Sequence, residues 1–483
     1  MTMEGEGLQA DAGLRASAAE SDAGTMSELF RVAVPLMVSS GSQSLMNAAD
    51  RIMLAGCSEA ALAAVTPASM LHWTVICIPL GTVLYANTFL SQYEGAGRTD
   101  RMMASLWQSI WLALFSGFLL LACIPFTRFV LGFSGHPPEV VELESQYFNT
   151  LCAGCPVLFV STALSCFFSG RRKTAVVMTI SIMAVLLNFV MDYLLVYGIG
   201  PFPELGIRGA ALATVGARCV ELLVYCVLLV RESRRLKLPL WEECRVDRGL
   251  LRRFLQFGIP SGLHFFVDNS GFTAFLMLVG RLSSTALAAT NLAFSVNGLI
   301  FVPLLGFGTA IQTLVGHHLG AGKIDCARRT TRNAVILGLT WTGVTGLLLI
   351  VFPEQSLWPF FFFADRSDGR GVDIAGLAAE SHVLLNFVAV YSVFDALAVV
   401  FSSALRGAGD TLYPMVMILG CSWLVMVLPA WLVVHSDGAS LTKLWMASSA
   451  NIVLAGLLML MRYSSGRWTK IQLVDVHEQG RGD

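Results

Sequence analysis

The chain has 483 residues, of which 55% are hydrophobic and only 13% are charged, and its formal net charge is −1. A soluble chain carries roughly a quarter charged residues, so this composition excludes a soluble globular enzyme and fits a polytopic membrane protein. Residues 1–28 are polar and lack both a basic start and an apolar core, so no secretory signal is indicated. We expect them to form a disordered cytosolic tail.

Twelve segments after this tail reach the roughly 20 apolar residues that a transmembrane helix needs. A basic stretch at 231–251 separates the sixth from the seventh and predicts a cytosolic linker. The fold class is therefore all-α, with six-helix bundles at 29–230 and 252–462 and a cytosolic tail at 463–483. The expected spans are 29–54, 60–88, 105–126, 147–170, 174–198, 207–230, 252–279, 285–312, 333–353, 376–406, 411–434 and 440–461.

The loops between these spans alternate in charge. Lys and Arg gather in one set of loops, which includes the linker, and are sparse in the other set. Because cytosolic loops are enriched in Lys and Arg, both termini are expected in the cytosol. The chain is then a multi-pass protein of the cytoplasmic (inner) membrane.

The two halves repeat one another. IPLGTVLYANTFLSQYEGAGR ends at Arg98 and PLLGFGTAIQTLVGHHLGAGK ends at Lys323, and the same offset aligns VAVP, ending at Pro35, with FGIP, ending at Pro260. Six spans are an even number, so both halves enter the membrane from the same side. Parallel repeats of this kind are related by a pseudo-two-fold axis along the membrane normal and enclose a central cavity. Proline favours a helix bend at both aligned positions.

Acidic residues outnumber basic ones within the apolar segments. A carboxylate at mid-bilayer costs at least ~2.5–3.5 kcal/mol, so these acids must be protonated, bind a cation or face water. Arg218 is the one base within a predicted helix body, and its spacing from Glu221 indicates a local ion pair. The acids are Asp50, Asp192, Glu221, Asp268 and Asp395.

Three pairs of polar residues are spaced four apart and so share a helix face. Asn188 and Asp192, with Asp50, would offer the hard oxygen ligands that suit Na⁺, and Thr214 would add a hydroxyl. Each group could instead be a structural hydrogen-bond cluster or a buried pair. The other two pairs are His264 with Asp268, which could share a proton, and Tyr391 with Asp395.

These strings resemble the multidrug and toxic compound extrusion (MATE) family over about residues 29–462. The resemblance is carried by the Pro35–Asp50 segment, both GAG[RK] helix ends, LLNFVMDYLLVYG and ALRGAGDT. It implies a non-enzymatic antiporter without cofactor, exchanging small cationic or amphipathic organic compounds for Na⁺ or H⁺. It also implies a cation site at Asp50 and another at Tyr391 and Asp395, with Asp268 standing where bacterial members more often have Glu.

Other functions fit the sequence less well. A lipid-linked oligosaccharide flippase would need Arg or Lys facing its anionic lipid, and an intramembrane aspartyl protease would need a YD partner for its GAGD motif at 407–410. Cys152 and Cys155 form a CxxC inside an apolar segment, which we interpret as packing. No nucleic-acid motif occurs, and we expect a monomer. The sequence leaves open the natural substrate, the choice between Na⁺ and H⁺, and which bundle couples.

Overall fold

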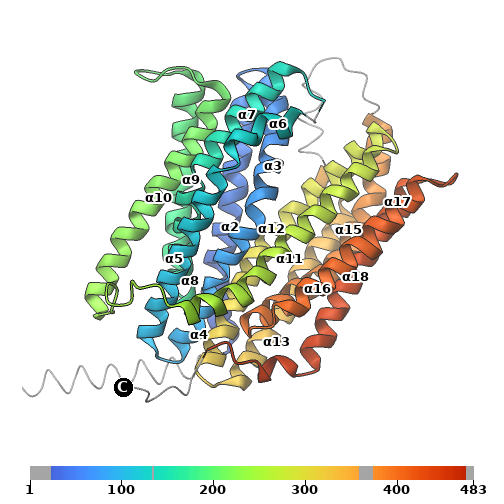
Figure 1. Cartoon of the computed structure of the whole chain (residues 1–483). Helices are drawn as coiled ribbons and strands as arrows, with labels where there is room; N and C mark the ends of the chain where they lie inside the picture. The colour runs from blue at the N-terminus through green and yellow to red at the C-terminus, as the bar shows by residue number, and fades with distance from the viewer. Residues whose placement is uncertain (1–22, 133–134, 358–373, 475–483) are drawn as a thin grey trace, which may run out of the picture.

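The computed structural model describes residues 23–132, 135–357 and 374–474, and within them every regular element is a helix (Figure 1). Ten of these helices are long and apolar enough to cross a membrane, and the bent pair formed by α7 and α8 makes an eleventh. The more polar α2, of 30 residues, completes the predicted set of twelve. The all-α, twelve-helix prediction is confirmed.

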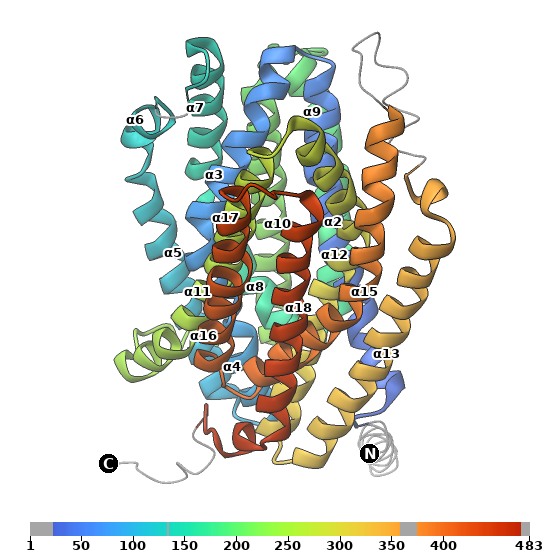
Figure 2. The ribbon, with the colours of Figure 1, turned by 90° about the vertical axis from the view of Figure 1, so that its right-hand side faces the viewer.

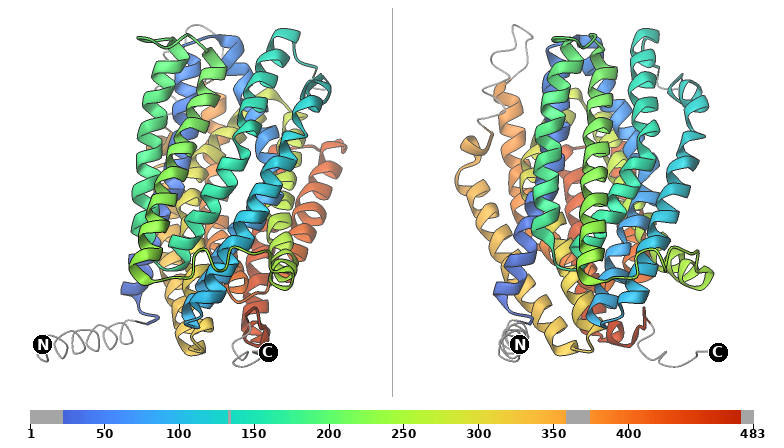
Figure 3. Two further views of the ribbon diagram at one scale, coloured as in Figure 1. Left: turned by 60° about the vertical axis from the view of Figure 1, so that its left-hand side comes forward. Right: turned by 90° about the vertical axis from the view of Figure 1, so that its left-hand side faces the viewer.

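The N-terminal bundle contains seven long helical pieces, because one span is broken at Gly154. It also carries a short 3₁₀ turn, Ile124–Phe126, and the short helix α6, Thr127–Leu131 (Figure 3). The long pieces are α2 (Met26–Ala55), α3 (Glu59–Leu84) with its continuation α4 (Ala86–Gly95), α5 (Thr99–Leu121), α7 (Pro138–Ala153), α8 (Cys155–Gly170), α9 (Thr174–Tyr197) and α10 (Gly206–Leu236).

The C-terminal bundle faces the viewer in Figure 2. One of its spans changes from α-helix to π-helix and back, at Cys421–Val427. A 3₁₀ turn, Arg467–Lys470, follows the last span. The helices are α11 (Arg248–Gly280), α12 (Ser284–Gly320), α13 (Ile324–Val351), α15 (Ile374–Gly407), α16 (Leu412–Gly420), α17 (Leu428–Val434) and α18 (Leu441–Ser464).

Local sequence signals explain several helix ends. Ser58 caps α3 by accepting from the backbone N–H of Ala61, and Ser283 caps α12 in the same way from Ala286. These two serines occupy matching positions of the repeat. Within α2, Pro35 removes the usual donor to the Arg31 carbonyl, and the Thr174 hydroxyl takes its place at 3.5 Å.

Polar contacts between the bundles show the pseudo-two-fold axis directly. The offset that aligns Arg98 with Lys323 also aligns Asn87 with Gln312 and Thr88 with Thr313. The amide of Asn87 donates to Thr313 Oγ1 at 2.7 Å, and the amide of Gln312 donates to Thr88 Oγ1 at 2.6 Å. Each hydrogen bond is the image of the other, as a two-fold axis between the bundles requires.

Close backbone approaches repeat the same symmetry. A Cβ atom on Gly81 would lie 2.7 Å from the Cα of Gly262, and a Cβ atom on Gly306 would lie 2.7 Å from the Cα of Met37. Only glycine permits such an approach. All these contacts lie toward the end of the bundles that carries the start of α2, the linker and the end of α18, where the ribbons converge in Figure 1. We call them the symmetric gate.

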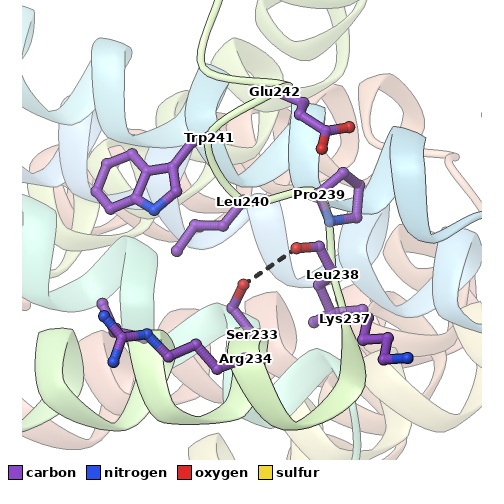
Figure 4. A pocket seen from close by; sticks show the side chains of 9 residues that line it. Ser233, Arg234, Lys237, Leu238, Pro239, Leu240, Trp241 and Glu242 are labelled. Atoms are coloured by element: carbon purple, nitrogen blue, oxygen red, sulfur yellow. Dashed lines mark hydrogen bonds between the residues drawn. The ribbon is translucent and has the colours of Figure 1, made fainter.

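The linker is shorter than the predicted 231–251, because α10 continues to Leu236 and α11 begins at Arg248. Trp107 and Trp111 of α5 hold it by donating from their indoles to the backbone carbonyls of Leu240 and Cys244, at 2.6 and 3.0 Å. The linker and the end of α10 enclose a pocket of about 440 Å³ (Figure 4).

Asp247 ends the linker and caps α11 by accepting from the N–H of Leu250. Its carboxylate also pairs with Arg101 of the other bundle at 3.0 Å. Partial burial alone would raise the pKa of Asp247, but the Leu250 N–H and the Arg101 guanidinium hold that pKa below its usual range. This end of the linker therefore stays anionic and joins the two bundles electrostatically.

The prediction of a disordered tail over residues 1–28 is wrong for its last part, and residues 1–22 lie outside the described residues. Thr25 caps α2, and Glu28 is buried. The Glu28 carboxylate pairs with Arg172 at 2.9 Å and lies 3.2 Å from His318 of the other bundle. A buried acid needs such partners, and they fix the start of α2.

Candidate functional site

Asp50 is the centre of a polar cluster inside the N-terminal bundle. Its side chain is buried near the end of α2 and receives three hydrogen-bond donors from other helices. The donors are Thr214 Oγ1 of α10 at 3.2 Å, Tyr147 Oη of α7 at 3.4 Å and Asn188 Nδ2 of α9 at 3.5 Å. The structure thus brings together Asp50, Asn188 and Thr214, the residues expected to share one site.

Asp192 belongs to the same cluster but has no donor. It lies one turn after Asn188 on α9, is fully buried, and is close enough to Asp50 for the two carboxyl groups to interact electrostatically. Neither Asp192 oxygen, nor Oδ1 of Asn188, has a hydrogen-bond partner among the described residues. Three buried acceptor atoms without a donor are unusual in a folded protein, and because the Asp192 and Asp50 carboxyl groups lie within hydrogen-bonding reach of each other, a shared proton or a bound cation would satisfy them.

Tyr147 is the member that sequence reasoning missed. It is a single tyrosine in α7, with no partner four residues away to mark it, and nothing in the sequence distinguished it from a packing residue. In the fold its ring is buried, and its hydroxyl reaches Asp50 and lies close to Ser69 of α3. It connects the cluster to a fourth neighbouring helix.

The C-terminal bundle holds the second predicted group in a different environment. Tyr391 is buried and its hydroxyl has no partner among the described residues, whereas Asp395 is half-buried and Asp268 of α11 is exposed. The two carboxyl groups are near enough to interact electrostatically. Asp268 also interacts electrostatically with Cys77 of α3 in the other bundle, which places it where the bundles face each other.

His264 does not join Asp268 in the way that the spacing suggested. No hydrogen bond links the two side chains in the part of the chain that the structure describes. The His264 ring lies instead against the backbone carbonyl of Pro414 and near Arg406. Shared helix face alone does not make a contact, because the two side chains can take rotamers that point apart.

Aromatic rings surround the second group. Phe272 lies one turn after Asp268 and contacts Phe294 edge to face, with 4.8 Å between ring centroids. Phe294 stacks on Trp445 at 4.9 Å, and Trp445 in turn stacks near Tyr391 at 6.4 Å. These rings form a continuous run of aromatic contacts near the two carboxylates. The sequence could not single them out among 30 Phe and 10 Trp residues.

Two ion pairs hold other intramembrane charges, whereas Arg406 of α15 has no acidic partner among the described residues and lies over the ring of Phe265, 5.6 Å from its centroid. Arg218 contacts Glu221 at 2.6 Å and also bonds to Gln43, which confirms the predicted ion pair. Asp410, from the GAGD motif, pairs with Arg462 of α18 at 2.7 Å. Acid hydrolysis by an aspartyl protease needs a second carboxyl group beside the first, whereas the partner of Asp410 is an arginine.

Two helical bundles with carboxylates inside their membrane spans define a membrane transporter, and comparison with known proteins gives the family. The MatE family model matches residues 35–194 and 260–432, once in each bundle, so the chain belongs to the MatE family and is not an enzyme. Over 92% of this chain and 93% of the relative, it is 27% identical to the "Probable multidrug resistance protein NorM" of Thermotoga maritima.

Other relatives agree with this assignment. The protein of the same name from Bradyrhizobium diazoefficiens is 27% identical over 90% of this chain and 92% of its own. Among solved structures, the outward-facing conformation of a multidrug resistance MATE family transporter matches with a TM-score of 0.83 and 20% identity, covering 92% of this chain and 97% of that one. At this identity the structural match establishes the fold alone.

Proposed function

We propose that this protein exports cationic or amphipathic organic compounds in exchange for Na⁺ or H⁺. The single observation that carries the proposal is the Asp50 cluster, where two buried carboxyl groups meet with acceptor atoms that lack donors. Relatives named as multidrug resistance proteins support the class of substrate. The chain would act as a monomer in the cytoplasmic membrane, with both termini in the cytosol.

The Asp50 cluster suits the coupling ion. Oxygens from Asp50, Asn188 and Asp192 are hard ligands of the kind that bind Na⁺, and the hydroxyl of Thr214 can turn its lone pairs toward an ion. A proton would serve the same electrostatic need, because two neighbouring carboxyl groups in a buried site do not both ionise readily. The antiport ion is therefore Na⁺ or H⁺, and both bind at the same atoms.

The Asp268 and Asp395 group suits the organic substrate. Asp268 is exposed and Asp395 is half-buried, and the exposed ring of Phe272 offers a π-face that attracts cations and packs against apolar parts of a ligand. Tyr391 and Asp395 could still bind an ion in exchange. With the coupling ion at the Asp50 cluster and the substrate at Asp268 and Asp395, each ligand lowers the affinity for the other through the change between outward- and inward-facing states, which is the reciprocal linkage that antiport needs.

The symmetric gate supports alternating access. It closes the end of the bundles that holds both termini, which in this proposal faces the cytosol. Facing inward then requires breaking the hydrogen bonds of Asn87 and Gln312 and separating Gly81 from Gly262. The predicted bends at Pro35 and Pro260 would help this movement, since both prolines lie within continuous helices that contribute to the gate.

The test is transport by the purified protein in liposomes. Ethidium flux would be followed while a Na⁺ gradient and a pH gradient are imposed separately. We expect one of the two gradients to drive ethidium uphill, which identifies the ion. Liposomes without protein and gradients reversed in sign are the controls. Failure of both gradients with a folded protein would contradict the proposal.

The flippase alternative is less well supported by the described residues. Its anionic diphosphate substrate would need a free base, and Arg218 is committed to Glu221 and Gln43. Arg406 has no acidic partner among the described residues, but it lies against Phe265 at the gate end, where its backbone carbonyl accepts from Tyr85. Flipping of a labelled diphosphate lipid in the same liposomes, without ethidium transport, would reverse this judgement.

A further inference from the structure

A second cluster of ligand-type side chains lies in the N-terminal bundle, outside the Asp50 cluster. It consists of His72 on α3, Cys152 on α7 and Cys155 on α8, and the ligand atoms of all three lie within 4.8 Å of one another. The Sγ atom of Cys155 is 3.5 Å from Nε2 of His72. Both cysteines are buried and are free thiols, while His72 is half-buried.

A break in the helix brings the two thiols together. Cys152 lies in the last turn of α7 and Cys155 begins α8, and the two helices meet at Gly154 with a bend of 45°. Gly154 packs tightly, since a Cβ there would lie 2.5 Å from Val215. The interpretation of this CxxC as part of one apolar helix is therefore wrong in its geometry, because the motif spans a rigid corner between two helices.

The distances in the cluster are close to those of a metal site. Zinc binds Cys sulfur at ~2.3 Å and His nitrogen at ~2.0–2.1 Å in tetrahedral geometry, which separates neighbouring ligands by roughly 3.5–3.8 Å. The Cys155–His72 pair already has that separation. A contraction of about 1 Å or less elsewhere completes the set.

We propose that His72, Cys152 and Cys155 form a binding site for one Zn²⁺-type metal ion, with a fourth position open to water. On binding, both thiols release their protons to water, and the two thiolates cancel the charge of the divalent ion. The complex is then electrically neutral, which an apolar interior tolerates. Monovalent soft ions such as Cu⁺ would leave a net negative charge in this place and are disfavoured.

The site would hold together three helices next to the Asp50 cluster. His72 follows Ser69 by about one helical turn on α3, and Cys152 follows Tyr147 on α7 by a little more than one turn. Ser69 and Tyr147 are themselves neighbours, and Tyr147 donates to Asp50. A bound metal would fix the corner at Gly154, and with it the helix that carries Tyr147.

The test uses the full-length protein in detergent, with any affinity tag removed and the thiols kept reduced. After equilibration with Zn²⁺ and removal of the unbound metal, elemental analysis should find one zinc per chain. Competition with a chelating dye gives the affinity. His72→Ala, Cys152→Ser and Cys155→Ser should each lower it at least tenfold, since even outer-shell changes weaken metal sites by 10–100-fold.

Cys166→Ala is the matched control. Cys166 is a buried cysteine of α8, like Cys155, but its Sγ contacts the Leu84 carbonyl instead of the cluster. This variant should bind zinc as the parent does. Zinc binding that survives in both Cys152→Ser and Cys155→Ser would overturn the proposal, and so would the absence of binding by the reduced parent protein.

X-ray absorption by the zinc-loaded parent protein tests the site even if the variants fold poorly. The proposal predicts two sulfur ligands at ~2.3 Å with nitrogen or oxygen ligands at ~2.0–2.1 Å. A shell of nitrogen and oxygen alone would place the metal elsewhere, for instance at His317 and His318 of α12, and would overturn the proposal. Cu⁺ outcompeting Zn²⁺ would overturn the choice of metal.

Discussion

The two bundles are alike at the gate and unlike at their carboxylates. The offset that pairs Asn87 with Gln312 at the gate places Asp50 opposite Phe275, and Asp268 opposite Gln43. Asp50 is buried among donors, and its counterpart Phe275 is a buried core residue. Asp268 is exposed, and its counterpart Gln43 bonds to Arg218.

In the proposed function, this difference separates two chemical tasks. The Asp50 cluster is closed and supplies its own donors and acceptors, which suits an ion that has lost its water. The Asp268 and Asp395 group is less tightly packed and lies near aromatic rings, which suits a larger ligand that keeps part of its hydration. In the proposed transport cycle the gate opens between the two bundles, which each contribute one half of its symmetric contacts, while each site needs only one bundle.

Removing the charge at the closed site should have the largest effect. Asp50→Asn keeps the size of the side chain but removes its charge, so we expect ion-dependent ethidium flux to fall about 100-fold, near the upper end of typical coupling between sites. The rise in melting temperature on adding the coupling ion should disappear as well. Both are measured with the purified protein.

Ser42→Ala is the control for this variant. Ser42 is buried on the same helix, and its hydroxyl bonds only to the Val38 carbonyl of its own helix. It should keep both flux and the ion-dependent melting shift. If Asp50→Asn also retains them, the ion is not bound in the N-terminal bundle and the division of tasks fails.

Removing the charge at the open site should weaken substrate binding and leave ion binding intact. For Asp395→Asn we expect about a tenfold loss of ethidium affinity, equivalent to ~1.4 kcal/mol, because one of two accessible carboxylates is lost. Fluorescence titration measures the affinity, and thermal unfolding with and without the coupling ion measures ion binding. Loss of the ion-dependent melting shift would show that both bundles bind the ion.

Sequence reasoning found the acidic residues whose burial in a membrane costs free energy. A carboxylate in an apolar span is visible in any single sequence, and so is an amide four residues away on the same helix face, as with Asn188 and Asp192. Tyr147 carries no such signal, because an aromatic residue in an apolar span is ordinary. Its role depends on α7 packing against α3 and α10 so that the Tyr147 hydroxyl reaches Asp50 of α2, nearly a hundred residues earlier in the chain.

The same limit applies to the repeat and to the CxxC. The repeat predicted the axis between the bundles, because matching strings in one order imply matching helices. It could not predict that Asn87 would reach Thr313, since that depends on how closely the glycines let the helices approach. The CxxC appeared to be helix packing because the break at Gly154 is a tertiary feature, fixed by Val215 of a helix that comes later in the chain.

Substitutions at the symmetric gate should have the smallest and most specific effect, a change in the population of molecules with a closed gate. Thr88→Val and Thr313→Val each remove one buried acceptor, for the amides of Gln312 and Asn87 respectively, and leave that amide without its partner. An unpaired buried donor costs about 1–3 kcal/mol. Each variant should therefore lower the ratio of closed-gate to open-gate protein by about fivefold or more, the factor that about 1 kcal/mol produces. The two variants should lower this ratio by similar amounts.

Spin labels carried by non-natural residues at Arg234 and Asp325, exposed positions at the gate end of the two bundles, would report the populations as distances. Thr342→Val is the control, because among the described residues the hydroxyl of this buried threonine donates to the Gly338 carbonyl of its own helix. Equal shifts in the two gate variants would show that both bundles stabilise the closed gate equally, although each bundle holds a different binding site. A shift in one variant alone would mean that the asymmetry of the carboxylates extends into the gate, and that one bundle controls its opening.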